Sequence, residues 1–501
     1  MGYGRVGGTP STARSTVTIA PTSPAAVDDI VRAAAAAGAE WKRASVAARV
    51  AALGAVADGL DAAADDLVPI AQRETHLAEA RLRGELRRTT FQLRMFGEML
   101  EDGAWFDARI DHADPQWPMG APRPDLRRVL EPIGPVLVFA ASNFPFAFSV
   151  AGGDTASALA AGNAVVLKAH HGHPELSAAT AAVVEGALRG AGAPDGVFAI
   201  IYGTDAGVRA LQAPAVKAAA FTGSVTGGRA LFDIAQARPE PIPFFGELGS
   251  TNPAFVTRRA ADRDPAALAA DYLASVTGSA GQLCTKPGVI LVPAGSELLA
   301  ALGGQQLPAA TPLLNDGIEQ GYRAAVARTA AVDGVRTIAG TVSEDESAPV
   351  VFATTAERLA AEMDTLMAEM FGPAALVVAY EDEADLVDIA RRLEGQLTAT
   401  VFAEPDDEIA AALVPVLAEK AGRVLWNQWP TGVSVTWAQQ HGGPYPATTA
   451  VGTTSVGMAA ISRFLRPVAY QNLPDALLPD ALKEANPLRI PRRVDGELVL
   501  P

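Results

Sequence analysis

GPVLVFAA, residues 134–141, decides how the rest of this 501-residue chain can be arranged. The run is short and apolar, which predicts a buried strand. A helix of small residues is expected next, over 152–161, and Gly162-Asn163 would close it. The apolar run 164–168 then predicts a second strand. This order of strand, helix and strand predicts a βαβ unit with parallel strands.

The same alternation continues on the carboxyl side of this unit. Helices are expected over 174–190 and 224–237, and strands over 197–202, 217–221 and 241–248. A second series follows, with helices over 265–277 and 319–332 and strands over 289–292, 374–379 and 399–402. Alternating elements of this length predict an α/β fold whose parallel sheets are covered on both faces.

Helices are expected on the amino side of the unit. One begins at Ser23-Pro24, a second covers 46–71 and a third covers 78–100, and together they would form a layer over a sheet. The third helix carries several charged residues, which we expect to form a solvated face with i,i+4 pairs: Arg81, Arg83, Glu85, Arg87 and Arg88. The tail, 472–501, ends in a strand-like run at 497–500, of a kind that often pairs with another subunit.

The composition excludes several classes of partner. The net charge is −16, so the long-range field repels nucleic acid and anionic membranes, although a local basic pocket could still bind a small anion. We expect no signal peptide and no membrane span, and therefore a cytoplasmic protein. Residues 2–7 match G-x-G-x-x-G, but no strand precedes them and no helical pattern follows. We therefore expect a flexible terminus there rather than a dinucleotide site.

The metal-ligating residue types give no site. Cys284 is the only cysteine, so the chain can form neither an internal disulfide nor a cysteine metal cluster. His170, His171 and His173 are close in sequence, with Glu175 just beyond. Their spacing fits a loop that leads into a helix and matches no common zinc pattern, so we expect no metal.

Cys284 is the first candidate for chemistry. A lone cysteine is most often inert core, but here small, glycine-rich and polar residues surround it, in the run Gly281-Gln282-Leu283-Cys284-Thr285. A carboxylate, Glu247, lies upstream in Glu247-Leu248-Gly249. A thiol with a carboxylate suggests covalent catalysis, in which sulfur attacks a carbon and the carboxylate later activates water.

Other candidates follow the predicted strands. Asn143 comes just after the first strand, at the edge where parallel sheets bind ligands, and could donate to an oxyanion; alone it would be an ordinary turn residue. Lys168 ends the second strand and could bind ribose hydroxyls or phosphate. The strand-to-helix turn at Gly223, Ser224 and Gly228 would let a pyrophosphate approach a helix N-terminus. Glu369 and Phe371 precede a later strand and could hold a ribosyl-nicotinamide.

Taken together, these segments resemble the aldehyde dehydrogenase superfamily over nearly the whole chain. They occur in the order and near the spacings of that family: 143–145, 165–168, 221–224 with Gly228, 247–249, 281–284 and 369–373. Within the superfamily the chain is most similar to the alpha-ketoglutaric semialdehyde (2,5-dioxopentanoate) dehydrogenases. The segments that carry this closer resemblance are 74–77, 92–94, 235–243, 429–433, 441–448 and 463–472.

The resemblance implies an aldehyde-dehydrogenase-like α/β fold. A doubly wound cofactor-binding domain would comprise 1–112 and 133–247, with 436–469 returning to it. Residues 248–435 would form an α/β catalytic domain, and 113–132 and 470–501 small oligomerisation segments. The implied assembly is a homo-oligomer, either a dimer or a tetramer.

The resemblance also implies a reaction and a role for each candidate. Cys284 attacks an aldehyde, Asn143 and the Cys284 backbone N–H stabilise the oxyanion, and hydride leaves to the nicotinamide. Water activated by Glu247 then hydrolyses the thioester. Lys168 and Glu369 hold ribose hydroxyls. The alternatives are an enzyme that passes the thioester to coenzyme A, which Glu247 disfavours, a broad or fatty aldehyde dehydrogenase, and a non-catalytic protein on the same scaffold.

Substrate and cofactor follow from details of the same resemblance. The expected substrate is 2,5-dioxopentanoate, which becomes 2-oxoglutarate, and its distal carboxylate needs a cation. Lys286 and the Arg127-Arg128 pair are the candidates for that cation. Many members of the superfamily have a carboxylate three residues after the strand lysine, where this chain has His171. Without that anion a 2′-phosphate is not repelled, so we expect NADP to be used at least as well as NAD.

Overall fold

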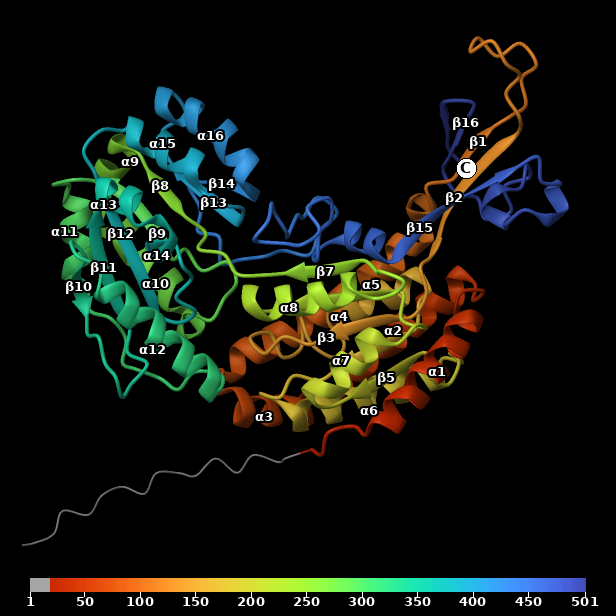
Figure 1. Ribbon diagram of the computed structural model, residues 1–501, viewed down its shortest axis with the longest axis horizontal. Helices are drawn as coiled ribbons and strands as arrows, with labels where there is room; N and C mark the ends of the chain where they lie inside the picture. The colour runs from red at the N-terminus through yellow and green to blue at the C-terminus, as the bar shows by residue number, and fades with distance from the viewer. Residues whose placement is uncertain (1–18) are drawn as a thin grey trace, which may run out of the picture.

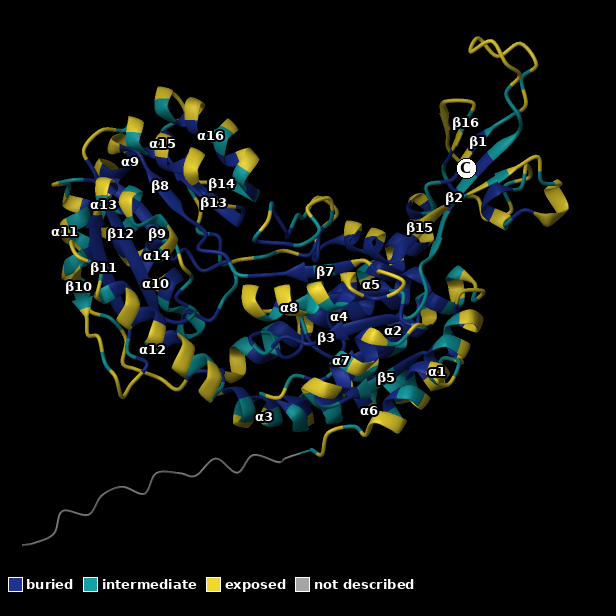
Figure 2. Ribbon diagram, in the orientation of Figure 1, coloured by how far each residue is buried: buried dark blue, intermediate teal, exposed yellow. Residues whose placement is uncertain are grey.

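The computed structural model describes residues 19–501, which form three sheets and the helices around them (Figure 1). The G-x-G-x-x-G match at 2–7 lies outside these residues, so the expectation of a flexible terminus stays a prediction. The central strands of two sheets are almost wholly buried, whereas the third sheet stands out from the body and exposes much of its surface (Figure 2).

The first sheet has five parallel strands in the order β5-β4-β3-β6-β7. Its strands are β3 (Val136–Phe139), β4 (Val165–Lys168), β5 (Phe198–Ile201), β6 (Ala218–Thr222) and β7 (Phe244–Glu247). The connecting helices are α5 (Gly153–Ala161), α6 (Pro174–Gly190), α7 (Thr204–Gln212) and α8 (Val225–Gln236). The expected βαβ unit is confirmed, because β3 pairs in parallel with β4 and α5 contacts both strands.

Four helices from the amino-terminal part of the chain complete the cover of this sheet. They are α1 (Pro24–Trp41), α2 (Val46–Ala62), α3 (Ala64–Thr75) and α4 (Glu79–Asp102). Helix α1 contacts α7 on one side, and α2 contacts α5 and α6 on the other, so the sheet is covered on both faces. The helical region expected over 46–71 is confirmed, although it is divided into two helices at Ala63 and continues to Thr75.

The charged face expected on α4 is also partly wrong. Glu85 is buried, and the terminal nitrogens Nη1 of Arg81 and both Nη1 and Nη2 of Arg88 are buried as well. The Glu85 carboxylate accepts the backbone N–H groups of Phe146 and Ala147, at 2.8 and 2.9 Å. The loop after β3 therefore covers this side of the helix, and the charged side chains line the interior.

The second sheet has seven strands in the order β10-β11-β12-β9-β8-β13-β14. Only β10 runs antiparallel to its neighbour. The strands are β8 (Ala254–Val256), β9 (Val289–Pro293), β10 (Arg336–Gly340), β11 (Val350–Thr355), β12 (Ala374–Tyr380), β13 (Gln396–Phe402) and β14 (Ala421–Trp426). Its alternate residues enter two separate apolar cores, one on each face, which is the pattern of a sheet covered on both sides.

Eight helices cover the second sheet. They are α9 (Arg258–Arg263), α10 (Pro265–Thr277), α11 (Glu297–Gly304), α12 (Asp316–Ala330), α13 (Ala356–Ala361), α14 (Met363–Leu366), α15 (Ala384–Arg392) and α16 (Glu408–Lys420). The expected αβ series over 265–402 is therefore confirmed, and α10 begins with Pro265 after the capping side chain of Asp264.

The third sheet forms an arm at the upper right of Figure 1, in the order β15-β2-β1-β16-β17. Its strands are β1 (Arg109–Asp111), β2 (Leu126–Pro132), β15 (Leu465–Gln471), β16 (Arg492–Val494) and β17 (Glu497–Val499). The expected terminal strand is therefore confirmed as β17, an edge strand. The domain boundaries stay a prediction, which the separation of the chain into these three sheets supports.

No helix among residues 19–501 is long and apolar enough to cross a membrane.

Candidate active site

Three of the candidate residues, Asn143, Lys168 and Glu247, lie at one edge of the first sheet, together with Thr222. Lys168, Thr222 and Glu247 are the last residues of β4, β6 and β7, and Asn143 follows β3. Because these strands are parallel and adjacent, their carboxyl ends meet at the same edge, where open α/β sheets bind ligands.

Cys284 reaches this edge on a tightly wound loop between α10 and β9. Ser279, Ala280 and Gly281 have φ of 54°, 52° and 68°, a left-handed conformation that costs energy for residues other than glycine. A Cβ on Gly281 would collide with the carbonyl group of Gly372. The Cys284 loop is therefore packed directly against the loop that carries Glu369 and Phe371.

Asn252 holds the backbone of the Cys284 loop. Its side-chain Nδ2 donates to the carbonyl oxygens of Cys284 at 2.8 Å and Lys286 at 2.9 Å. Gln396 supports Asn252 in turn, since its Oε1 accepts the Asn252 backbone N–H and both donors of Thr251. Neither Asn252 nor Gln396 was predicted to have a role; the position of Asn252, five residues after Glu247, could have indicated one.

His441 contacts the sulfur of Cys284. Its Nε2 lies 3.6 Å from Cys284 Sγ. Burial and the charges of Arg423 and Arg88 lower the pKa of His441 to about 3, so the imidazole is neutral at pH 7. Its Nδ1 is buried without a hydrogen-bond partner among residues 19–501. His441 begins the segment 441–448, which carries part of the family resemblance, but no role was predicted for it.

The thiol is strongly protonated in this environment. Burial, followed by the charges of Glu247 and Glu369, raises the pKa of Cys284 to about 12. Burial also raises the pKa of Glu247 well above its usual value, against the opposing charge of Arg463. One oxygen of Glu247, Oε2, is buried without a partner in the described part of the chain. Deprotonation of the thiol therefore requires a proton acceptor or an added positive charge.

Asn143 lies beside the Cys284 loop. The Asn143 Nδ2 donates to the carbonyl of Gln282 at 3.2 Å. The backbone carbonyl of Asn143 accepts a hydrogen bond from Arg81 at 2.8 Å. The structure therefore places Asn143 beside the Cys284 loop, and the charge of Glu247 acts on the Cys284 thiol. The catalytic role of each residue stays a proposal.

The turn from β6 to α8 leaves the N-terminus of α8 exposed to solvent. Ser224 caps α8, with its Oγ accepting the Gly227 N–H at 3.2 Å, and residues 223–226 are exposed. A Cβ on Gly223 or Gly228 would meet the Phe221 ring or Leu248 respectively. Thr222 Oγ1 is buried without a partner among residues 19–501. Small residues and free N–H groups at this end fit a phosphate.

Glu369 faces the opposite side of this edge. A Cβ on Gly249 would lie 2.6 Å from its Oε2, so a larger residue at position 249 would displace the carboxylate. Burial raises the pKa of Glu369, and the charge of Lys286 opposes this shift. Phe371 lies in the same loop, two residues further on. A cavity of about 570 Å³ is lined by Val225, Gly249 and Glu369, among others.

The prediction that Lys286, Arg127 or Arg128 binds the distal carboxylate of the substrate is wrong. Lys286 Nζ is buried and donates to the carbonyls of Met370, Gly372 and Ala374, at 2.6, 3.0 and 2.8 Å, which uses all three of its hydrogens. Arg127 and Arg128 lie on β2 in the arm and pair with Asp125 and Asp107.

The three clustered histidines have separate surroundings. His171 is exposed, and its ring stacks on that of His170 at 4.3 Å. Burial, followed by the charge of Lys168, lowers the pKa of His171. His173 is buried between the Ala141 carbonyl and Ser177, so it has a structural role. No group of three or more His, Cys, Asp or Glu that could hold a metal occurs among residues 19–501.

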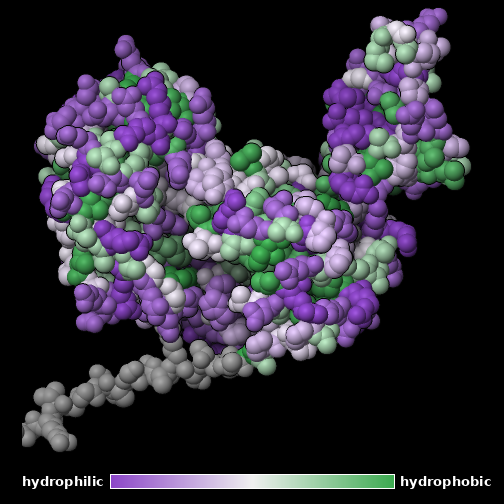
Figure 3. Space-filling model, in the orientation of Figure 1, coloured by the Kyte–Doolittle hydropathy of each residue, from purple (hydrophilic) through white to green (hydrophobic). Residues whose placement is uncertain are grey.

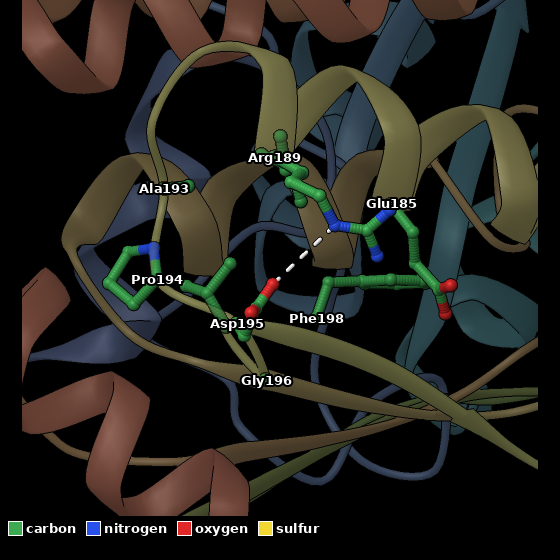
Figure 4. Close-up of a pocket in the computed structure, with 9 residues that line it drawn as sticks. Glu185, Arg189, Ala193, Pro194, Asp195, Gly196 and Phe198 are labelled. Atoms are coloured by element: carbon green, nitrogen blue, oxygen red, sulfur yellow. Dashed lines mark ion pairs between the residues drawn. The ribbon is translucent and has the colours of Figure 1, made fainter.

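A second cavity, of about 460 Å³, lies away from these residues (Figure 4). It is formed by the end of α6 and the segment 193–198 that enters β5, and Arg189 and Asp195 pair across it at 3.5 Å. This is the amino-terminal edge of the first sheet, opposite to the edge that carries the candidate residues. None of the predicted site residues lines it.

Comparisons with known proteins agree with this geometry. The profile of the aldehyde dehydrogenase family matches residues 8–445. The alpha-ketoglutaric semialdehyde dehydrogenase of Acinetobacter baylyi is 44% identical, over 86% of this chain and 84% of that protein. Alpha-ketoglutaric semialdehyde dehydrogenase 2 of Azospirillum brasilense is 45% identical, over 90% and 88%.

Solved structures give the same fold. Lactaldehyde dehydrogenase from Escherichia coli superposes with a TM-score of 0.76 at 20% identity, over 90% of this chain and 92% of that one. An NAD-dependent aldehyde dehydrogenase from Sinorhizobium meliloti superposes with a TM-score of 0.73 at 23% identity, over 90% and 87%. Because the family profile matches residues 8–445 and both relatives are at least 44% identical over more than four fifths of each chain, this chain belongs to the aldehyde dehydrogenase family.

Proposed function

We propose that this protein oxidises 2,5-dioxopentanoate to 2-oxoglutarate with NAD(P), through a thioester on Cys284. The single observation that carries the proposal is the meeting of Cys284, Glu247 and Asn143 at one sheet edge in a member of the aldehyde dehydrogenase family. The relatives at 44% and 45% identity bear the name of that activity, which supports the choice of substrate.

Each residue has a distinct task in this proposal. The Cys284 thiolate forms a bond to the aldehyde carbon, and the carbonyl oxygen becomes an oxyanion that the Asn143 amide and the Cys284 N–H stabilise. His441 Nε2 lies 3.6 Å from the sulfur and can hydrogen-bond to it, but with a pKa of about 3 this imidazole is too weak a base to take the thiol proton, which leaves to solvent. Glu247 removes a proton from the water that cleaves the thioester, a task suited to its raised pKa.

The residues present fit a nicotinamide dinucleotide. Lys168 and the turn with Gly223, Ser224 and Gly228 would hold its ribose and pyrophosphate, and Glu369 and Phe371 its nicotinamide end. When bound, this cofactor supplies the hydride acceptor for the oxidation. The exposed N-terminus of α8, the unpartnered Thr222 hydroxyl and the cavity beside Gly249 and Glu369 support this assignment.

NADP is proposed as the cofactor used at least as well as NAD. His171 is exposed three residues after Lys168, where a carboxylate would repel a 2′-phosphate. Because its pKa is lowered, His171 would act as a neutral hydrogen-bond donor rather than as a cation. Lys168 supplies the positive charge.

A homo-oligomer, dimer or tetramer, is the proposed assembly. The arm ends in β17, an edge strand on which Leu498 is 62% exposed, and apolar residues are visible over the arm in Figure 3. Such an edge favours pairing with a second copy. Light scattering before and after removal of residues 497–501 tests this point. The cytoplasmic location expected from the sequence stays a prediction.

An aldehyde panel tests the proposed reaction. Reduced-nicotinamide absorbance would be followed with 2,5-dioxopentanoate, succinate semialdehyde and hexanal, with NAD and NADP, in the presence and absence of coenzyme A. The highest kcat/KM is expected with 2,5-dioxopentanoate and without a requirement for coenzyme A. A preference for hexanal would indicate a fatty aldehyde enzyme, and dependence on coenzyme A would indicate an acylating one.

A further inference from the structure

Arg88, on helix α4, has two buried terminal nitrogens that form no hydrogen bond within the described part of the chain. Its Nη1 and Nη2 have no hydrogen-bond partner among residues 19–501, and only its Nε donates, to the Val433 carbonyl at 3.4 Å. A buried guanidinium normally has partners, since leaving one unsatisfied costs free energy. Such a group is poised for an anion that enters from outside.

The neighbouring cations are already engaged. Arg423 donates from both terminal nitrogens to the carbonyls of Gly432 and Pro430. Arg81 donates to the Asn143 carbonyl and faces Glu85 at 3.6 Å, and Arg463 is paired with Asp154 at 2.6 Å. Among these arginines, which all lie in the described part of the chain, Arg88 therefore has the greatest unused hydrogen-bonding capacity.

Arg88 lies on the same side of the site as the reactive sulfur. Its guanidinium stands 5.5 Å over the Phe148 ring, and that ring lies 6.2 Å from the ring of His441. His441 in turn lies 3.6 Å from Cys284 Sγ. The charge of Arg88 also lowers the pKa of both Cys284 and His441, which agrees with this proximity. Arg88 therefore lies in the neighbourhood of the sulfur, on the side of His441 and Phe148.

The local charge suits an anion. Arg81, Glu85 and Arg88 together carry an excess of positive charge, although the whole chain has a net charge of −16. The Glu85 carboxylate is occupied by the backbone N–H groups of Phe146 and Ala147, through Oε1. The other oxygen, Oε2, faces Arg81 at 3.6 Å, and neither oxygen hydrogen-bonds to the terminal nitrogens of Arg88 in the described part of the chain.

We propose that Arg88 binds the carboxylate of the substrate, at the end opposite the aldehyde that reacts with Cys284. Its two terminal nitrogens match the two oxygens of a carboxylate, a bidentate pairing that fixes orientation as well as affinity. The proposal rests on the proposed function and names the residue that would confer specificity for an acidic aldehyde over a neutral one of equal length.

The test compares two aldehydes that differ only in the carboxylate. The ratio of kcat/KM for 5-oxopentanoate to that for pentanal would be measured in the wild type, Arg88→Met and Arg88→Lys. We expect the ratio to fall by about 100-fold in Arg88→Met, because a buried charge pair is lost. Arg88→Lys keeps the positive charge but loses the bidentate geometry of the guanidinium group. The ratio of kcat/KM values is therefore expected to fall by about 10-fold. Arg87→Met, an exposed neighbour on the same helix, is the matched control and should keep the wild-type ratio.

A binding measurement separates this inference from the proposed function. Glutarate, a dicarboxylate without an aldehyde, would be titrated by calorimetry into each protein. Glutarate that binds the wild type and Arg87→Met but binds Arg88→Met at least about 10-fold more weakly supports the inference even if no aldehyde is oxidised. Unchanged glutarate affinity together with an unchanged ratio would overturn it and assign Arg88 to charge balance for Glu85. If Arg88→Met does not fold, the same two readouts in Arg88→Lys decide the question.

Discussion

The two large sheets supply their halves of the active site by different means. The first sheet presents Asn143, Lys168 and Glu247 at the carboxyl ends of its strands. The second sheet contributes Cys284 and Glu369 from loops that precede β9 and β12, at the amino ends of its strands. The carboxyl edge of one parallel sheet therefore faces the amino edge of the other.

This difference shows what each edge needs to hold a side chain in place. At the carboxyl edge, a residue is fixed by the strand it ends and by the hydrogen-bonded neighbours of that strand. At the amino edge no strand supports Cys284, and buried polar side chains fix its loop instead: Asn252, Lys286 and Gln396 bind backbone groups around it. The first arrangement is robust to single changes, and the second should not be.

The largest effect is expected from substitutions that remove one reactive group from each side of the site. Cys284→Ala should lower turnover by about 1000-fold or more, because no nucleophile remains. Glu247→Gln should give a burst of reduced cofactor and then slow turnover, since the thioester forms but is not hydrolysed. Stopped-flow absorbance distinguishes the two, with Glu240→Gln as an exposed control. Full steady-state activity in either variant would contradict the assignment of roles.

The next largest effect breaks the support of the second sheet without touching the chemistry. Asn252→Ala removes the donors to the Cys284 and Lys286 carbonyls at a residue with φ of 51°. We expect a loss of about 3 kcal/mol in the free energy of unfolding and a fall of about 100-fold in kcat/KM. Urea unfolding and steady-state kinetics measure the two quantities.

Asn427→Ala is the matched control for that variant. Asn427 has φ of 50° and exchanges two hydrogen bonds with Ala403, but it lies at the far end of β14. It should lose stability and keep most of its kcat/KM. Equal losses of activity in the two variants would show that the loop has no special need of Asn252.

A smaller effect is expected at the cofactor end of the first sheet. His171→Glu places a carboxylate where a 2′-phosphate would lie, so the KM for NADP should rise about 10-fold while that for NAD changes little. His171→Gln removes the imidazole without adding charge and should change neither value by as much. If KM for both cofactors is the same in all three proteins, position 171 does not meet the 2′ end.

The smallest effect concerns the coupling of the two edges through charge. Below its pKa of about 12, Cys284 should be alkylated by iodoacetamide faster as pH rises, with no plateau between about pH 6 and pH 9. Glu247→Gln should react at the wild-type rate while Glu247 is protonated, and about 3-fold faster once Glu247 ionises, because that anion raises the pKa of the thiol. A plateau below pH 8 would reveal a thiolate that the geometry does not predict.

The site residues that were predicted from the sequence are those directly adjacent in the chain to a predicted strand or helix. Asn143, Lys168 and Glu247 are adjacent to apolar strands, and the Gly223-Ser224 turn directly precedes its helix, so pattern and position identify them together. Residues brought from a distance were missed: His441 is 157 positions from Cys284, and Gln396 is 144 from the backbone N–H of Asn252. No periodicity records such a pairing.

The charged residues of α4 show a second reason for failure. Arg81, Glu85 and Arg88 recur at the spacing of one helix face, which is also the spacing of a solvated face. What buries them is the loop 143–148, which donates two backbone N–H groups to Glu85. The sequence of the helix does not show that the backbone N–H groups of this loop need a hydrogen-bond acceptor.

The arm has a consequence for how the chain is made. Strands β1 and β2 leave the ribosome early, but β15, which pairs with β2, begins only at Leu465, and β16, which pairs with β1, only at Arg492. At about 5–20 residues per second, the hairpin waits on the order of tens of seconds with both outer edges unpaired. We therefore expect prematurely terminated chains to expose this hairpin, and chaperones to be needed until synthesis reaches the last 40 or so residues.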